Sequence, residues 1–381
     1  MSRYRVLEMI DKPSLGGGQR AVVLLAGALD AGTFDVAVCA PPGGPLGEEL
    51  KRLGIRHHPA SFGRRHWRRN IRDLLHLLRT ESIDVVHTHG GVAGFFGRWA
   101  AWQAKTQVIV HTLHGIHYLH YRNPITKRVF IHLEKDFSRF TDRLVLVSDE
   151  DRRSALEFKL APESKMVVIK NGVELRGLPT PGDPVRLRGE LGLDPAGLVV
   201  GTVSRLHRQK GVAYLIRAAA LMKEKIPGLQ VLCVGGGPLE RRMRRLVAKL
   251  GLQGTVRLVG ETPEALKHLA AFDIFVLPSL WEGLPFVLIE AAALRKPIVA
   301  TAVEGNREVI ADGETGLLVP ARDPAALAAA VARLAGDAGL ASRLGQAAAR
   351  LIPPRFALSR MIRETEELYL SVWREKHPLS R

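Results

Sequence analysis

The chain has 381 residues, of which 46% are hydrophobic and 24% charged, so it is long enough for two globular domains and too apolar to be disordered. Its 55 lysines and arginines against 38 acidic residues give a formal net charge of +17, which favours a negatively charged partner. Two cysteines, Cys39 and Cys233, exclude a disulfide framework or a cysteine-rich zinc site. Nucleic acid, a phosphorylated small molecule and an acidic lipid surface all remain open as partners.

Short apolar runs alternate with longer segments of helical period along the whole chain. The runs lie at 4–10, 35–39, 84–89, 107–113, 143–148, 197–204, 229–235, 255–260, 273–279 and 297–301. This repetition predicts an α/β protein of two doubly wound, Rossmann-like domains with parallel sheets. Because such sheets bind ligands beyond the carboxyl ends of their strands, the loops after the strands should carry the chemistry.

A segment rich in proline and glycine divides the two series of strands. Residues 178–184 read Leu-Pro-Thr-Pro-Gly-Asp-Pro, which is typical of a linker. We therefore predict an N-terminal domain over 1–177 and a C-terminal domain over 185–354. Residues 355–381 are expected to form an amphipathic helix that packs back on the N-terminal domain.

The positive charge is concentrated between residues 51 and 79, where nine basic side chains stand against one acidic one. A basic helix start that carries an aromatic residue can lie on anionic lipid headgroups. It can equally be a solvated helix face, and the pattern alone leaves both interpretations open. The residues concerned are Arg64, Arg65, Trp67, Arg68 and Arg69.

A glycine-rich loop follows a predicted strand in each domain, at 16–18 and at 235–237. Glycine lets the backbone approach a phosphate closely, and N–H groups at a helix start attract an anion. After the first loop, a helix is predicted from near Gln19. Neither loop has the spacing of a dinucleotide-binding fingerprint or of a P-loop, so those two classes are not supported.

Two segments of the predicted C-terminal domain carry opposite charges. Arg205 and Lys210 follow one predicted strand, and Glu282 and Glu290 follow another. We expect Glu282 in the loop before a helix and Glu290 on the second turn of that helix. Two cations can neutralise a diphosphate, and two carboxylates can accept hydrogen bonds from hydroxyl groups.

Taken together and in this order, these segments resemble the family 4 glycosyltransferases of the GT-B fold, which use nucleotide sugars and retain anomeric configuration. The resemblance covers nearly the whole chain. It rests on the Glu-x7-Glu segment 282–290, the SRLHRQKG segment 204–211, the GGG loop 235–237, the HTLHG strand end 111–115 and the NGV turn 171–173. It implies two facing domains, the first binding the acceptor and the second the nucleotide sugar.

The resemblance also implies roles for individual residues. Arg205 and Lys210 would bind the donor diphosphate and stabilise the charge that develops on it. Glu282 would hold hydroxyls of the donor sugar, His114 would lie beside that sugar, and Glu290 would accept hydrogen bonds from the ribose. Further donor contacts are implied at Gly17, Gly18, Gly237, Gly260, Glu261, Leu284, Phe286, Val287 and Leu288.

Two polar clusters could suggest a metal ion, and each has a simpler interpretation. Residues 149–151 read Asp-Glu-Asp, but Ser148 before them predicts a helix N-cap with acids in the first turn. The histidines at 87, 89, 111, 114, 117 and 120 favour a histidine-lined cleft over zinc, because no HExxH pattern occurs. We expect neither a metal ion nor another cofactor.

The sequence therefore predicts a retaining, metal-independent hexosyltransferase. Residues 85–102 resemble family members of bacterial envelope polysaccharide pathways, so we expect a lipid-linked or saccharide acceptor of the lipopolysaccharide or exopolysaccharide type. No signal peptide or bilayer-spanning stretch is predicted, which implies a cytoplasmic protein held peripherally on the inner face of the membrane. A non-catalytic nucleotide-sugar-binding protein and a basic nucleic-acid-binding protein are the alternatives, although we expect no nucleic acid.

Overall fold

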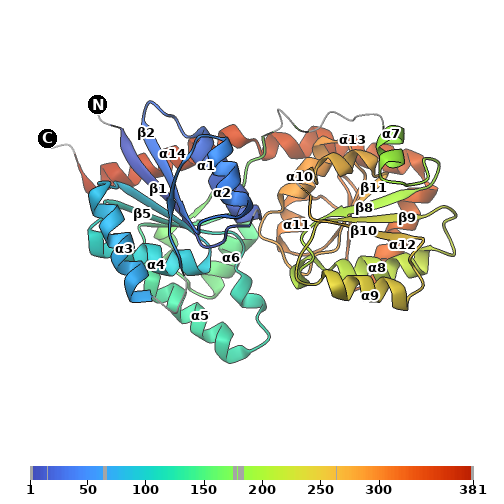
Figure 1. Cartoon of the computed structure of the whole chain (residues 1–381), viewed down its shortest axis with the longest axis horizontal. Helices are drawn as coiled ribbons and strands as arrows, with labels where there is room; N and C mark the ends of the chain where they lie inside the picture. Colours follow the sequence, from blue (N-terminus) through green and yellow to red (C-terminus); the bar gives the residue numbers. More distant parts are fainter. Residues whose placement is uncertain are drawn as a thin grey trace. The chain divides into compact units, whose positions relative to one another are not determined.

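The computed structural model describes residues 3–14, 16–62, 67–174, 178, 184–262 and 264–378. The chain falls into two compact units (Figure 1): unit 1 is Met1–Gly172 with Leu358–Arg381, and unit 2 is Val173–Ala357. Each unit is an α/β domain with a single parallel sheet, which confirms the predicted fold class. Of the predicted linker 178–184, only Leu178 and Pro184 belong to the described residues.

Unit 1 is built on a seven-stranded sheet in the order β3-β2-β1-β4-β5-β6-β7. Its strands are β1 (Tyr4–Ile10), β2 (Phe34–Ala40), β3 (Arg56–Pro59), β4 (Val85–His89), β5 (Val108–Leu113), β6 (Arg143–Leu146) and β7 (Met166–Val168). Its helices are α1 (Gly17–Ala28), α2 (Gly44–Arg52), α3 (Trp67–Thr80), α4 (Gly91–Ala104), α5 (Pro124–Phe137), α6 (Asp149–Glu157) and α14 (Leu358–Lys376). The inner strands β1, β4 and β5 are almost wholly buried because helices cover both faces of the sheet.

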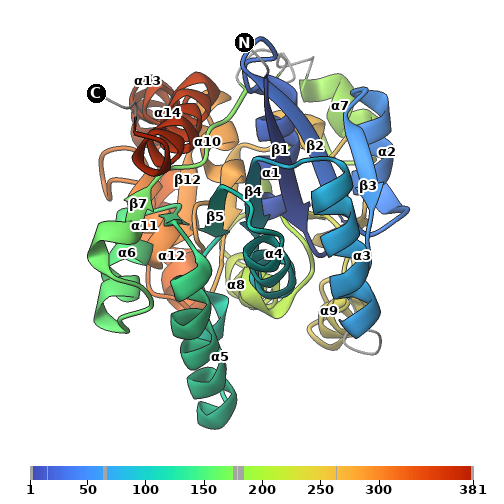
Figure 2. The ribbon, with the colours of Figure 1, turned by 90° about the vertical axis from the view of Figure 1, so that its left-hand side faces the viewer.

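Strand alternation sorts the side chains of unit 1 into two layers. Val6 of β1 packs with α1 and α14, whereas Leu7 and Met9 pack with α3 and α4. Figure 2 shows α3, α4 and α5 on the side of the sheet that faces the viewer. Helix α14 is the predicted C-terminal helix; it returns to this unit and buries Leu368 and Tyr369 in the same core cluster as Val6.

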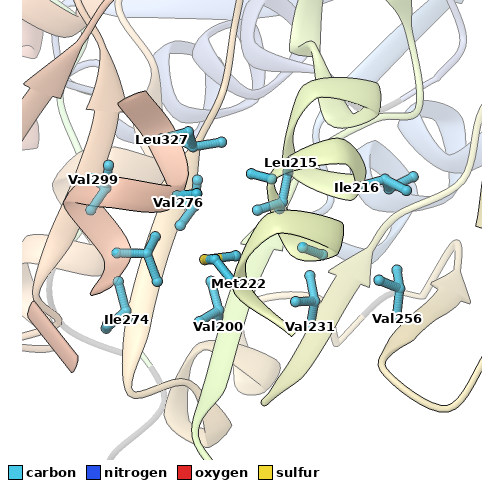
Figure 3. Close-up of a cluster of buried hydrophobic side chains, with 14 of the residues drawn as sticks. Val200, Leu215, Ile216, Met222, Val231, Val256, Ile274, Val276, Val299 and Leu327 are labelled. Carbon is cyan, nitrogen blue, oxygen red and sulfur yellow. The ribbon is translucent and has the colours of Figure 1, made fainter. Parts of the chain in front are cut away.

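Unit 2 has a six-stranded sheet in the order β10-β9-β8-β11-β12-β13. Its strands are β8 (Val199–Val203), β9 (Gln230–Val234), β10 (Val256–Gly260), β11 (Ile274–Leu277), β12 (Ile298–Thr301) and β13 (Leu317–Val319). Its helices are α7 (Pro184–Glu190), α8 (Val212–Met222), α9 (Glu240–Lys249), α10 (Phe286–Ala293), α11 (Glu304–Val309), α12 (Pro324–Gly336) and α13 (Ala338–Arg355). Figure 3 shows one face of this sheet, where Val200, Val231 and Val276 pack against Leu215 of α8 and Leu327 of α12.

The first helix begins earlier than predicted, at Gly17 instead of near Gln19. The Gln19 side chain accepts a hydrogen bond from the backbone N–H of Gly16 at 3.1 Å, so it closes the helix start from inside. Gly17 and Gly18 are therefore helical residues. Their backbone N–H groups belong to the first turn, where the positive end of the helix dipole lies.

No single helix in the described part of the chain is long and apolar enough to cross a membrane. Only α12 and α13 together meet such a criterion of length and composition, and the two are bent by 102° relative to each other. The break lies at Asp337, whose carboxylate accepts a hydrogen bond from Leu340 N at 2.8 Å and caps α13. Leu327, Val331 and Leu344 of this pair are buried in the core of unit 2.

Candidate active site

The charged residues predicted in unit 2 follow two strands that are neighbours in the sheet. Arg205 and Lys210 follow β8, and Glu282 follows β11. The strand order runs outward from this pair in both directions, because β9 and β10 lie beyond β8 while β12 and β13 lie beyond β11. Such a switch point is where doubly wound sheets bind their ligands. The predicted residues thus meet at the expected place.

Close backbone packing joins the two loops. Gly211 has φ +61°, and a Cβ at this position would lie 2.0 Å from the carbonyl oxygen of Pro278. Leu280 N donates a hydrogen bond to Gln209 O at 2.7 Å, and Gln209 Nε2 donates to Trp281 O at 3.1 Å. Only glycine fits at 211, and the joined loops hold Lys210 next to Glu282.

Lys210 and Glu282 form a direct ion pair. Lys210 Nζ donates to Glu282 Oε1 at 2.6 Å, and Ser279 Oγ donates to the same oxygen at 2.6 Å. The two charged side chains are 21% and 5% exposed, respectively. No described residue donates a hydrogen bond to Glu282 Oε2. Arg205 is exposed and has no ion-pair partner among the described residues, so one carboxylate oxygen and one guanidinium remain for a ligand.

The remaining donor residues predicted in unit 2 lie at the ends of β9, β10 and β11 and at the start of α10. Glu282 is in the loop and Glu290 is buried on the second turn of α10, which confirms their predicted positions. Leu284, Phe286 and Leu288 are buried and Val287 is half-buried. Gly237 has φ +147° and packs against the backbone of Leu206; Gly235 N donates to Gly260 O at 2.8 Å, and Glu261 lies against Gly236. The loops after β8, β9 and β10 are therefore in contact.

Unit 1 contains a buried polar network at the carboxyl ends of its central strands. Alternation puts Glu8 of β1 and His87 and His89 of β4 on the sheet face that α14 covers. Glu8 Oε2 lies 2.5 Å from His89 Nε2, and the Tyr369 hydroxyl donates to Glu8 Oε1 at 2.9 Å. His87 bridges Tyr369 Oη at 2.6 Å and Thr112 Oγ1 at 2.7 Å.

His114 extends this network beyond the end of β5. Its Nε2 lies 2.9 Å from His89 Nδ1, and the planes of the two rings are inclined by 19° with their centroids 5.2 Å apart. Its other nitrogen, Nδ1, is buried and has no hydrogen-bond partner among the described residues. A Cβ on Gly18 would lie 3.1 Å from His114 Cδ2, so the start of α1 packs directly on this ring. The structure thus brings together Gly18 and His114, which the sequence placed in separate loops.

Burial and charge act on the pKa values of this network in defined directions. Burial raises the pKa of Glu8, but attraction to His87 and hydrogen bonds from His87 and His89 outweigh it, so the pKa lies well below the ordinary value. Burial, together with repulsion from His87, lowers the pKa of His89 to about 4. Burial and the neighbouring histidines likewise hold the pKa of His114 well below its ordinary value. At neutral pH Glu8 is therefore ionised, whereas His89 and His114 are neutral.

These shifts predict that unit 1 loses stability on acidification. The pKa of His89 is about 4 in the folded state against an ordinary value of 6.5, so the unfolded chain binds more protons as the pH falls from 6.5 to 4. Glu8 acts in the same direction below 4.5, its ordinary value. The free energy of unfolding from urea titrations should fall across this range, and His89→Gln should flatten the slope. A slope unchanged in His89→Gln, or flattened equally by His132→Gln on the exposed side of α5, would contradict this.

Protein contacts involve residues of both possible metal clusters. Ser148 Oγ accepts a hydrogen bond from Asp151 N at 3.0 Å, which confirms the predicted N-cap of α6. The possible ligand atoms of Glu8, His87 and His89 lie within 4.8 Å of one another, which is close enough to hold a metal ion. However, Glu8 Oε2 and His89 Nε2 are already in direct contact at 2.5 Å, so an ion between them would have to separate the two groups.

The described part of the basic window supports an exposed basic surface. Arg64 and Arg65 lie outside the described residues. Trp67 begins α3 and is 51% exposed, with the Arg68 guanidinium 5.4 Å from its ring centre. Arg69 is also exposed, and its fourth neighbour along the helix, Asp73, pairs with it at 3.5 Å.

Comparison with known proteins assigns the class. The family model described as Glycosyl transferases group 1 matches residues 186–351, and the model described as Glycosyl transferase 4-like domain matches residues 16–172. The chain belongs to this glycosyltransferase family and has its two-domain, Rossmann-like GT-B fold. The predicted family and fold are thereby confirmed.

Individual relatives agree with this assignment. The chain is 31% identical over 305 residues to EpsD of Bacillus subtilis (strain 168), provisionally named a glycosyltransferase, with 78% of this chain and 79% of EpsD covered. It is 28% identical, over 88% of this chain and 89% of the relative, to the Escherichia coli UDP-Gal:alpha-D-GlcNAc-diphosphoundecaprenol alpha-1,3-galactosyltransferase. The fold matches the crystal structure of Anabaena HepE in complex with UDP-glucose, with a TM-score of 0.87 at 21% identity over 96% of this chain and 99% of HepE.

Several residues of the two sites were missed at the level of sequence. Glu8 and Tyr369 are 361 positions apart and meet only because α14 returns to unit 1. Ser279 lies at the end of an apolar run and looked like part of a strand. One signal could have revealed Glu8, since an acidic residue inside the apolar run 4–10 can be buried only with a partner.

Proposed function

We propose that this chain is a retaining glycosyltransferase that moves a hexose from a nucleoside diphosphate sugar to a lipid-linked saccharide acceptor without a bound metal. The observation that carries the proposal is the Lys210–Glu282 pair at the switch point of unit 2, with Arg205 exposed in the same loop as Lys210. A cation and a carboxylate at this position suit a ligand that carries both a diphosphate and hydroxyl groups. Membership of the glycosyltransferase family supports the same kind of ligand.

Each residue then has a defined task. Arg205 and Lys210 bind the diphosphate and stabilise the negative charge that it gains as the bond from the sugar C1 to the phosphate oxygen breaks. Glu282 Oε2 accepts hydrogen bonds from sugar hydroxyls, and Glu290 accepts from the ribose. The acceptor oxygen forms its bond to C1 on the face that the diphosphate leaves, and its proton passes to the departing phosphate oxygen. This front-face course preserves the anomeric configuration.

The name of one relative supports a proposal for the donor and the acceptor. The E. coli protein is named for transfer of galactose from UDP-Gal to a sugar on diphosphoundecaprenol. We propose the same class here, a UDP-hexose donor and an acceptor sugar on a lipid diphosphate. Proton NMR of the isolated product tests the retaining mechanism. The anomeric signal of the transferred sugar should show the same configuration as in the donor. A product of opposite configuration would overturn the retaining mechanism, and binding without turnover would favour a non-catalytic sensor.

Metal independence gives a direct prediction. If Arg205 and Lys210 neutralise the diphosphate, no divalent ion is needed for that purpose. Turnover of the donor should be the same in EDTA as in magnesium or manganese, after the protein has been stripped of metal and dialysed. Activity that disappears in EDTA and returns with one divalent ion would contradict the proposal.

We further propose that the outer surface of α3, α4 and α5 rests on the inner face of the cytoplasmic membrane. Helix α4 lies between α3 and α5 on one side of the sheet (Figure 2). The surface joins the basic start of α3 to exposed apolar groups: Trp102 of α4 is 47% exposed and Ile125 of α5 is 72% exposed. Basic and aromatic side chains together suit an anionic headgroup layer.

Vesicle sedimentation tests this surface. Each basic residue near an anionic leaflet contributes about 1 kcal/mol, so changing Arg68 and Arg69 to Gln should lower the partition coefficient about thirty-fold. The matched control changes Arg241 and Arg242, exposed on α9 of unit 2, and removes the same charge. Equal losses in both double variants, or binding indifferent to anionic lipid, would argue for a soluble acceptor.

A further inference from the structure

The network around Glu8 is costly for a structural role alone. Glu8, His87 and His89 are buried where the neighbouring core positions are apolar. An ionised carboxylate inside a domain is stabilised only by hydrogen bonds and opposite charge, and replacing such a group by apolar residues often leaves a protein as stable or more so. The network ends at His114, so we ask what these buried groups do to that residue.

Each hydrogen bond of the network around Glu8 has a defined donor and acceptor. An ionised carboxylate can only accept, so His89 must carry a proton on Nε2 and donate it to Glu8 Oε2 across 2.5 Å. The Tyr369 hydroxyl donates to the other oxygen, Glu8 Oε1, at 2.9 Å. Both oxygens of Glu8 are therefore held, and the position of the carboxylate is defined.

The same logic continues to His114. With the proton on Nε2, a neutral His89 offers a lone pair at Nδ1, so His114 Nε2 must be the donor of the 2.9 Å contact. The pKa of His89, lowered to about 4 by burial and by His87, keeps this ring neutral at physiological pH. His114 then has a lone pair at Nδ1, the buried nitrogen without a hydrogen-bond partner among the described residues.

We propose that Glu8, acting through His89, holds His114 in the tautomer that is protonated on Nε2, so that the buried Nδ1 is kept as a hydrogen-bond acceptor. Glu8 and His89 are thus positioning residues. Gly18 assists, because its lack of a Cβ lets the first turn of α1 pack on the ring and fix its plane. The loss of turnover expected in the variants below rests on the function proposed above, whereas the tautomer does not.

NMR of the full-length protein tests the tautomer directly. Two-bond proton–nitrogen correlations on protein labelled with ¹⁵N-histidine distinguish a protonated ring nitrogen from an unprotonated one. The chain has 14 histidines, so His114 is assigned by comparison with His114→Gln. The expected result at pH 7 is a proton on Nε2 and none on Nδ1. A proton on Nδ1, or on both nitrogens, would overturn the proposal whatever the variants below do.

Variants then test whether Glu8 is the cause. In Glu8→Gln the amide can donate or accept, so both tautomers of His114 should be populated. Donor turnover should fall about 10-fold to 100-fold in kcat with little change in KM, which is typical of lost positioning. Tyr369→Phe is the matched control, because it removes one hydrogen bond to Glu8 and leaves the path to His114 intact. The path from Glu8 through His89 to His114 is called the relay. A single His114 tautomer that persists in Glu8→Gln, or a mixture of tautomers in Tyr369→Phe, would contradict the relay.

The two readouts separate this inference from the proposed function. If the purified protein turns over no nucleotide sugar and yet His114 is protonated on Nε2, the proposed function fails and the relay stands. If the protein is an active transferase and His114 is protonated on Nδ1, the relay alone fails.

Discussion

Replacing Glu282 by Ala should lower kcat/KM for the donor about 10²-fold to 10³-fold, the cost of about 2.7 to 4 kcal/mol that follows loss of one preorganised electrostatic group. Two effects combine here. The variant loses the carboxylate proposed to hold the sugar hydroxyls, and it also leaves Lys210 without the partner that positions its ammonium at 2.6 Å. Release of the nucleoside diphosphate, measured with a coupled assay, gives the rate.

The control for this variant must be an acidic residue of unit 2 outside the site. Glu240 on α9 pairs with Arg244, four residues further along the helix, at 2.7 Å, so Glu240→Ala should retain wild-type turnover. Lys210→Ala should lose as much as Glu282→Ala, and the double variant should lose little more, because the two residues act as a unit. Normal turnover in Glu282→Ala would contradict the assignment.

The second large effect is on stability. Replacing Glu134 by Ala should destabilise unit 1 by about 3 to 5 kcal/mol, because it leaves the Arg98 guanidinium buried without a countercharge. Arg98 and Glu134 are 0% and 1% exposed, and their two contacts measure 2.6 and 3.2 Å. The guanidinium also lies 5.4 Å from the ring centre of Phe137. Arg98 of α4 therefore contacts two residues of α5, Glu134 and Phe137.

Urea unfolding followed by tryptophan fluorescence measures this cost. Four of the five tryptophans, all except Trp281, lie in unit 1, so the signal reports mainly on that unit. The double variant Arg98→Met with Glu134→Leu should recover most of the stability, because it removes both charges and keeps the volume. Glu163→Ala, which breaks an exposed pair with Arg152, should change the unfolding curve little. A small loss in Glu134→Ala would mean that water reaches Arg98.

The sequence predicted those features that depend on local pattern. Alternating apolar runs and helical segments indicated two parallel sheets, and the position of charged residues after particular strands indicated where ligands bind. Glu282 and Glu290 were placed correctly because a helix start and its second turn are local features. Helix α1 starts at Gly17, two residues before the Gln19 near which the sequence predicts its start, because the Gln19 side chain accepts a hydrogen bond from Gly16 N.

Features that depend on distant pairs were not predictable in this way. Contact between Lys210 and Glu282 needs β8 and β11 to be neighbours, and strand order is not a local property. The Glu8 network likewise needs a helix from the far end of the chain, which supplies Tyr369. In both cases the sequence showed polar residues of the right kind, while the sheet topology and the return of α14 decided which of them meet.

The central claim, that the switch point of unit 2 binds a nucleoside diphosphate sugar through Arg205 and Lys210, is tested most directly by a thermal-shift panel. Wild-type protein and Arg205→Ala are each melted with UDP, GDP and ADP and with their hexose derivatives. A ligand at 100 times its Kd stabilises the folded state by about 2.7 kcal/mol. We predict a clear rise in Tm of the wild type with the UDP series and a much smaller rise in Arg205→Ala. No rise with any nucleoside diphosphate, or an equal rise in Arg205→Ala, would contradict the claim.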